Sequence, residues 1–216
     1  MNQQETLAWV LDLLPGEPTV ASHQVGPSFP AVTVAELSVE SDATPSRPET
    51  VAMTLNASQL DPQLETEDGS DLRVEFITIT SGHTDTAGQL LAAAFAMIAE
   101  DPRVRTPQPG TFLPHLGAHV DPTITAKHGL LLAPFVWAEG VPHVHEVTSG
   151  GKRSKDKSDK EFEFTHPGRL TVPAQLVMLN DEEYRIALTE GLNAVQDHIA
   201  AQGIDLNDVW RVPAEL

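Results

Sequence analysis

The chain has 216 residues, the length of one large domain or two small ones, and it can bury a full hydrophobic core without disulfides or metals. Its net charge of −18, from 31 acidic against 13 basic residues, repels nucleic acid and anionic membranes and attracts basic proteins. No cysteine is present, which excludes disulfides, thiolate metal sites and a cysteine nucleophile. We therefore expect no nucleic-acid or membrane partner, although an acidic surface also serves solubility alone.

The sequence contains no recognisable export or membrane signal. Its first residues lack the positive charges of a signal peptide. The longest apolar runs, at residues 90–99 and 130–137, fall short of the roughly 20 residues that a membrane-spanning helix requires. We therefore expect a soluble, cytoplasmic protein.

The first third of the chain predicts one helix followed by short strands. Residues 3–14 place leucine and valine at helical spacing, and Pro15 and Gly16 end the pattern. The proline-rich stretch that follows favours short strands separated by turns. We expect strands at residues 31–39 and 50–56, and polar surface loops at 42–49 and 57–71.

The clearest local pattern is a strand, a turn and a helix in the middle of the chain. The sequence LRVEFITIT at residues 72–80 is rich in β-branched residues and runs into a Ser-Gly turn. A helix then begins near Thr84 or Asp85, either of which can accept hydrogen bonds from the free N–H groups of the first turn. Apolar residues at helical spacing continue until Pro102 ends the helix.

The last third predicts a second strand–helix unit. Asn180 is a good helix N-cap, and Glu183 is placed to reach back to it in a capping box. We expect a single helix from this cap to Gly203, with a buried stripe of Tyr184, Leu188, Leu192, Val195 and Ile199. Strands are expected before it at residues 129–137, 141–148 and 170–179.

A basic loop separates the last two of these strands. Residues 150–160 (GGKRSKDKSDK) contain no apolar side chain, so burial cannot offset the entropy of ordering them, and we expect a surface loop with net charge +3. Lys152, Arg153 and Lys155 are candidate partner contacts for a phosphate or an acidic patch, and a solvated surface segment is the simpler interpretation. Trp137, at the end of an apolar strand, is the other candidate partner contact.

Four histidines form two closely spaced pairs that could ligate a metal. His143 and His145 are two residues apart, and on a strand both would point to one face. His115 and His119 are four residues apart, which suits one face of a helix, but the proline and glycine around them disfavour a helix there. If the pairs converge, we expect zinc or iron; the alternative is ordinary surface or turn histidines.

No catalytic motif is recognisable. Residues 81–85 read Ser-Gly-His-Thr-Asp, but a catalytic triad needs its members to converge from separate elements, and these are neighbours in one turn. The patterns G-x-S-x-G, G-x-G-x-x-G and G-x-x-x-x-G-K-[ST] are all absent. We therefore expect no catalytic residue and no cofactor.

Several short motifs follow one another in an order that resembles one protein family. Gly191 and a terminal segment from Gly203 to Arg211 are the last landmarks of the series. Taken together, residues 70–211 resemble the suppressor-of-fused (SUFU-like) domain family in its bacterial single-domain form. The other motifs are FITITSG at residues 76–82, a helix containing LLAAAF, PGT at 109–111, LLLAPFVW at 130–137, LVML at 176–179 and NDEEYRIA at 180–187.

This resemblance implies a single α/β (α+β) domain over residues 1–216, with a mixed, largely antiparallel sheet, helices packed against it and no catalytic centre. Animal members bind a transcription-factor peptide by strand addition between two lobes, and because this chain resembles only the first lobe, no binding residue is carried over. Bacterial relatives resemble immunity proteins, which implies a protein partner such as a basic toxin. Two alternatives stay open: a metal-dependent enzyme that uses the four histidines, and a structural component that self-associates through Trp137.

Overall fold

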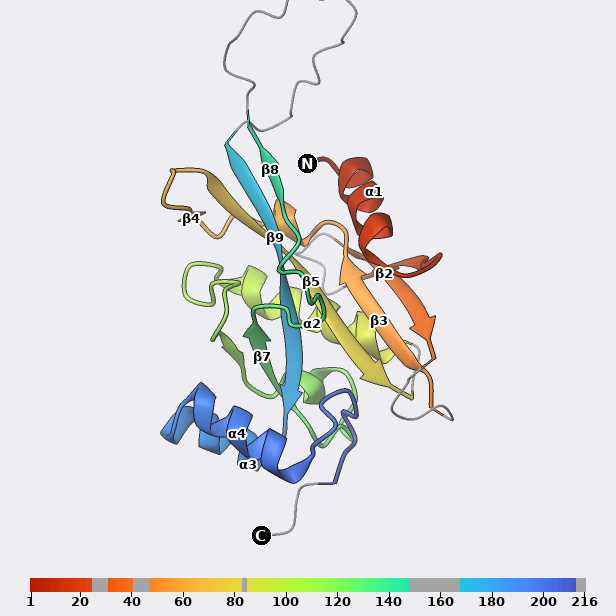
Figure 1. Ribbon diagram of the computed structural model, residues 1–216, viewed down its shortest axis with the longest axis vertical. Helices are drawn as coiled ribbons and strands as arrows, with labels where there is room; N and C mark the ends of the chain where they lie inside the picture. Colours follow the sequence, from red (N-terminus) through yellow and green to blue (C-terminus); the bar gives the residue numbers. More distant parts are fainter. Residues whose placement is uncertain (25–30, 41–46, 83–84, 148–167, 213–216) are drawn as a thin grey trace, which may run out of the picture.

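One mixed β-sheet forms the centre of the protein (Figure 1). The computed structural model describes residues 1–24, 31–40, 47–82, 85–147 and 168–212, and these form nine strands and four α-helices. The strands are β1 (Thr19–His23), β2 (Val32–Val39), β3 (Glu49–Thr54), β4 (Leu64–Glu65), β5 (Asp71–Ser81), β6 (Phe112–Leu113), β7 (His128–Leu132), β8 (Val144–Glu146) and β9 (Arg169–Leu179). The helices are α1 (Gln3–Leu13), α2 (Thr86–Glu100), α3 (Asp181–Thr189) and α4 (Leu192–Gln202), with short 3₁₀ helices η1 (Ala57–Gln59) and η2 (Leu116–His119).

The strand order confirms a mixed, largely antiparallel sheet. The order is β1-β2-β3-β5-β9-β7-β6, with β4 added to β5 and β8 added to β9. The β5–β9 pair is parallel, and the other described pairs are antiparallel. Among the described helices, none is long and apolar enough to cross a membrane.

Helices cover both faces of the sheet. Successive residues of a strand point to opposite faces, so each strand contributes to two layers. On β3, Val51 and Met53 pack against Val10 of α1, whereas Ala52 between them belongs to the larger cluster around Leu91 of α2. The sheet therefore lies between α1 on one face and α2 on the other.

Helices α3 and α4 cover the α1 face at the far end of the sheet. The parallel register pairs Ile77 of β5 with Gln175 of β9, so Val177 and Leu179 point to the same face as Ile77. These two residues pack against Val195 of α4, whereas the side chains on the opposite face of β9 pack under α2. The two ends of the α1 face are thus covered by different helices.

The predicted last helix is two helices. Gly191 has φ 95° and ψ 172°, a backbone conformation that is essentially restricted to glycine, and it separates α3 from α4. The expected buried stripe is therefore wrong at the junction, because Leu188 is 57% exposed and Leu192 is 36% exposed. The capping box at Asn180 and Glu183, in contrast, is confirmed.

Several predicted strands are shorter in the structure. The strand expected at residues 129–137 ends at Leu132, because the chain leaves the sheet near Pro134 and the N–H of Phe135 donates to the side chain of Gln175 at 3.1 Å. The strand expected at 141–148 is reduced to β8, with residue 148 outside the described residues. Strands β1 and β4 were not predicted individually, and β4 with η1 occupies the expected loop at 57–71.

The start of α2 differs in detail from the prediction. Asp85 occupies the N-cap position, but its carboxylate accepts from the side-chain amide of Gln89 at 3.2 Å and not from a backbone N–H. Thr84, the other predicted cap, lies outside the described residues. The strand, turn and helix themselves are confirmed as β5 and α2.

A buried ion pair fastens the C-terminal segment to β9 and α3. Arg211 donates from Nε and Nη2 to the two carboxylate oxygens of Glu183, and from Nη2 also to the carbonyl of Met178. The side chains of Glu183 and Arg211 are 0% and 8% exposed. Removing one partner of such a pair leaves the other charge buried without compensation.

We predict that Arg211→Ala lowers the free energy of unfolding by about 3–5 kcal/mol, because the Glu183 carboxylate stays buried while it loses its cation. Urea denaturation measures this change. The matched control is Arg185→Ala on α3, the helix that carries Glu183. This substitution removes an exposed pair with Glu182 and should change the stability little. Equal effects of the two substitutions would contradict the assignment.

His128 links β7 to the starts of η2 and α3. Its Nε2 lies 2.8 Å from Oδ1 of Asp181, and its Nδ1 accepts from the backbone N–H of His115 at 3.3 Å. Its ring also stacks on Tyr184, with ring centroids 4.1 Å apart. Burial lowers the pKa of His128 below its usual 6.5, against the opposite effect of Asp181. Both ring nitrogens are used inside the fold, so His128 is neutral and structural.

We predict that the free energy of unfolding falls as the pH is lowered through 6.5, because the unfolded chain then binds a proton at His128 that the folded chain does not. The loss ends below the lower, folded-state pKa of this residue. Urea denaturation at about pH 7.5, 6.5 and 5.5 measures the effect, because these values span one pH unit on either side of the reference pKa of a histidine. In His128→Gln this decrease should be smaller; an unchanged decrease would show that other groups cause it.

Candidate functional site

The outer edge of β1 is unpaired among the described residues. Strand β1 pairs with β2 along one side, from Thr19 opposite Glu36 to His23 opposite Val32. No strand among the described residues pairs with its other side. Val20, the second residue of the strand, is 51% exposed. An edge of this kind presents backbone N–H and C=O groups to which another chain can add a strand.

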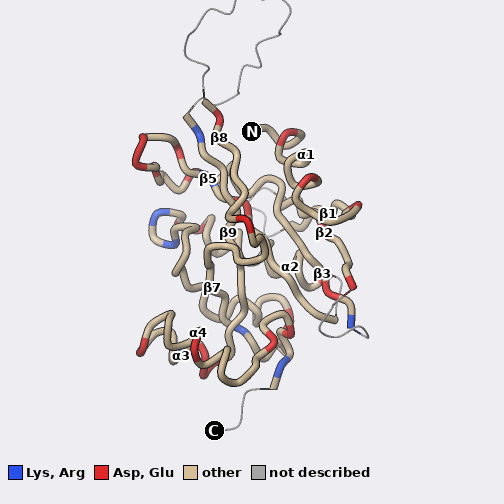
Figure 2. The backbone as a smooth tube through the Cα atoms, viewed as in Figure 1, with Lys and Arg blue, Asp and Glu red and all other residues tan. Residues whose placement is uncertain are grey.

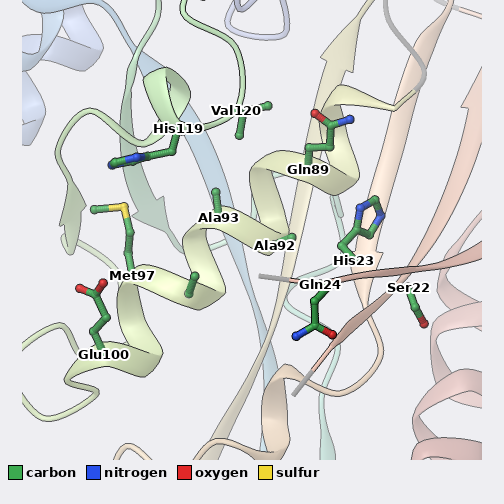
Figure 3. A pocket seen from close by; sticks show the side chains of 11 residues that line it. Ser22, His23, Gln24, Gln89, Ala92, Ala93, Met97, Glu100, His119 and Val120 are labelled. Atoms are coloured by element: carbon green, nitrogen blue, oxygen red, sulfur yellow. The ribbon is translucent and has the colours of Figure 1, made fainter. Parts of the chain in front are cut away.

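A groove runs beside this edge along α2, and we call it the α2 groove. It encloses about 600 Å³ between the end of β1, one side of α2 and the end of η2. In Figure 3, His23 and Gln24 lie on one side of α2, and His119 and Val120 lie on the other. Alanine side chains form the floor of the groove and leave it hollow, and the residues at its rim are mostly polar. The floor includes Ala92, Ala93 and Ala96, and the rim includes His23, Gln24, Gln89, Glu100 and His119.

Two titratable side chains meet where β1 reaches α2. His23 Nε2 and Glu36 Oε1 are 4.0 Å apart, and neither atom has a hydrogen-bond partner in the described part of the chain. Burial lowers the pKa of His23 and raises the pKa of Glu36. Gly88 permits this approach, since a Cβ there would lie 1.9 Å from Glu36 Oε1. Burial thus shifts the titration of both groups toward their neutral forms.

Acidic residues occur along many elements of the described structure. Figure 2 shows Asp and Glu along α1, the β4 region and the C-terminal helices, with Lys and Arg at fewer points. This distribution follows from the excess of 31 acidic over 13 basic residues in the whole chain. The open strand edge thus belongs to a protein whose overall field attracts cations and basic proteins.

The four histidines predicted as metal ligands lie at separate places. His115 contacts His128, with ring centroids 4.8 Å apart, and His119 lies on the rim of the α2 groove. His143 and His145 line a different hollow beside β4, where His145 Nε2 is 2.8 Å from the hydroxyl of Ser70. In the described ranges, no group of three or more His, Asp or Glu side chains could hold a metal ion.

The predicted partner contacts are only partly within the described structure. Trp137 is partly buried and packs with Val136 against the cluster under α1. Lys152, Arg153 and Lys155 lie outside the described residues, as does the rest of the basic loop at 150–160. Sequence reasoning missed the β1 edge and the α2 groove because both depend on contacts between segments far apart in the chain.

The fold, unlike the sequence, matches known proteins. No protein-family model matches the sequence, and no curated protein matches it. The crystal structure of a protein described as a SUFU (suppressor of fused protein) homolog from Neisseria gonorrhoeae matches with a TM-score of 0.61 and 14% identity, over 99% of this chain and 97% of that chain. A chain of the Sufu–Fu complex matches with a TM-score of 0.56 and 14% identity, over 90% of this chain and 81% of that chain.

At 14% identity, these matches establish the fold and no more. They extend the likeness beyond residues 70–211, where the sequence motifs lie, to almost the whole chain. The resemblance predicted from the order of those motifs is therefore confirmed at the level of structure: the protein has the SUFU-like fold.

Proposed function

We propose that this chain is a non-catalytic protein-binding domain and that its partner is a basic protein. The observation that carries the proposal is the open edge of β1 beside the α2 groove, where a partner can add a strand and place side chains in the groove. The net charge of −18 supports a basic partner, because it accelerates the approach of positive surfaces. A protein of the same fold is known in a complex with another protein, the Sufu–Fu complex.

We further propose that the basic partner is a toxin and that the chain acts as its immunity protein. Toxins that cleave nucleic acids need a positive surface to hold their substrate. An acidic domain that covers such a surface blocks the substrate by competing for the same charges. The resemblance to bacterial single-domain forms supports this role, and so does the steering effect of the charge.

No geometric observation favours either alternative function. A metal-dependent enzyme needs the four histidines to converge, and they lie at the separate places described above. Self-association through Trp137 needs a free tryptophan face, and much of this side chain packs on the cluster under α1. Protein binding is therefore the function that we propose.

We predict that the wild-type chain, used as bait in a native lysate, captures a basic protein at low salt and retains it at moderate salt. Val20→Lys should reduce the recovery about tenfold, because it places a positive charge on the open edge and opposes a basic partner. Mass spectrometry identifies the captured protein, and quantitative blotting measures its recovery. If that protein is a toxin, co-expression of the wild-type chain should restore growth and Val20→Lys should not.

The control for this experiment carries the same charge change elsewhere. Val141 is 38% exposed and lies just before β8, and four strands (β2, β3, β5 and β9) separate β8 from β1 in the sheet. Val141→Lys should capture the partner as well as the wild type does. Recovery of no protein at either salt concentration would contradict the proposal. Equal losses in both variants would show that the β1 edge is not the binding surface.

A further inference from the structure

A second groove, at β7 and β9 toward the other end of the strand order from β1, is apolar. We call it the α4 groove. It encloses about 530 Å³ where α4 and the loop at 133–137 lie over β7 and β9. Its walls include Leu130 and Leu132 of β7, Val177 and Leu179 of β9, and Val195 and Ile199 of α4. The break at Gly191 sets the direction of α4 and so contributes to the shape of this groove.

Two large apolar side chains at the groove are exposed to solvent. Phe135 is 60% exposed and Leu192 is 36% exposed, and both line the groove. They extend the apolar surface of the groove beyond its enclosed volume. A partner that covers them must therefore be larger than a small molecule. Contiguous apolar surface of this kind on a soluble domain marks a site of interaction.

The walls of the α4 groove carry no positive charge. None of the described residues that line the groove carries a charge. Five exposed acidic residues lie on the segments that carry the lining residues: Glu139, Asp181, Glu190, Asp197 and Asp205, of which Asp181 pairs with Lys127. An apolar groove with carboxylates around it is complementary to a segment that combines apolar and basic residues.

We propose that the α4 groove binds a short segment of a second protein in which apolar side chains are flanked by Lys or Arg. The proposal rests on the function proposed above, since it gives the basic partner a second contact on this chain. A second copy of the chain is a poor occupant, because two chains that each carry a net charge of −18 repel each other. In the sheet, β2, β3, β5 and β9 separate β1 from β7, so the two contacts can be tested independently.

The test uses three fluorescein-labelled peptides of equal length and fluorescence anisotropy. One peptide is an amphipathic Leu/Lys sequence, the second has Glu at every Lys, and the third has Ser at every Leu. We expect the Leu/Lys peptide to bind at least about tenfold more tightly than either of the others, because only this peptide matches both the apolar groove and its acidic surroundings. Methyl NMR spectra should place the changes at Leu132, Leu179 and Val195.

The variant Phe135→Ser/Leu192→Ser removes apolar surface and leaves the charge unchanged. It should weaken the Leu/Lys peptide about tenfold or more. The matched control, Leu11→Ser/Val104→Ser, removes two exposed apolar side chains from α1 and from the turn after α2, and it should bind as the wild type does. Circular dichroism and thermal melting establish that both variants are folded.

Equal affinity for the Leu/Lys and Leu/Glu peptides, or unchanged binding by folded Phe135→Ser/Leu192→Ser, would overturn the proposal. So would a dimer, seen by sedimentation, that this variant abolishes, because the groove would then hold a second copy. If the peptides do not bind the α4 groove, the prediction of partner capture through the β1 edge at Val20 is not affected. Conversely, peptide binding in the groove would persist if the lysate experiment failed.

Discussion

The register that places Ile77 of β5 beside Gln175 of β9 determines how the protein is organised. Both strands run in the same direction, so the helices that follow them, α2 and α3, begin at the same end of the sheet (Figure 1). They pack on opposite faces: α2 covers the face of Phe76, while α3 and α4 cover the face of Val177. A shift of one residue in this register would turn every apolar side chain of β9 to the other face.

The two proposed binding surfaces follow from this arrangement. Helix α2 crosses the sheet toward β1, and its alanines leave the α2 groove beside an edge that no described strand pairs with. Helix α4 lies over β7 and β9 at the other end of the order, where the chain leaves the sheet at Leu132. Polar residues surround the first groove and apolar residues line the second. A partner that touches both would therefore be recognised by two different kinds of interaction, which favours specificity.

Most buried polar side chains whose contacts are described have structural partners. Glu75 in the middle of β5 accepts from the backbone N–H groups of Ala57 and Ser58 and so holds η1 on the sheet. The side chains of His128 and Glu183 likewise accept from the backbone N–H groups of His115 and Asn180, at the starts of η2 and α3. His23 and Glu36 differ, because their facing atoms are buried beside the α2 groove without hydrogen-bond partners in the described part of the chain. A partner that supplied a hydrogen bond at that corner would satisfy one of these buried atoms.

Local signals in the sequence predicted the elements that they determine. The β-branched run of β5, the apolar spacing of α2 and the Asn180–Glu183 capping box each act within a few residues, and each was placed correctly. The end of β7 and the break at Gly191 were missed, because a side chain of β9 and a glycine conformation decide them. The Glu183–Arg211 pair and both grooves were also missed, since they join segments that are distant in the chain.

The central claim is that the protein acts by binding a basic partner through shape and negative charge. The most direct measurement is the rate of association with the captured partner as salt is raised from about 20 to about 500 mM, which shortens the screening length from roughly 20 Å to a few Å. We predict that this rate falls by about tenfold or more while the dissociation rate changes little. An association rate that is constant over this range would contradict the claim.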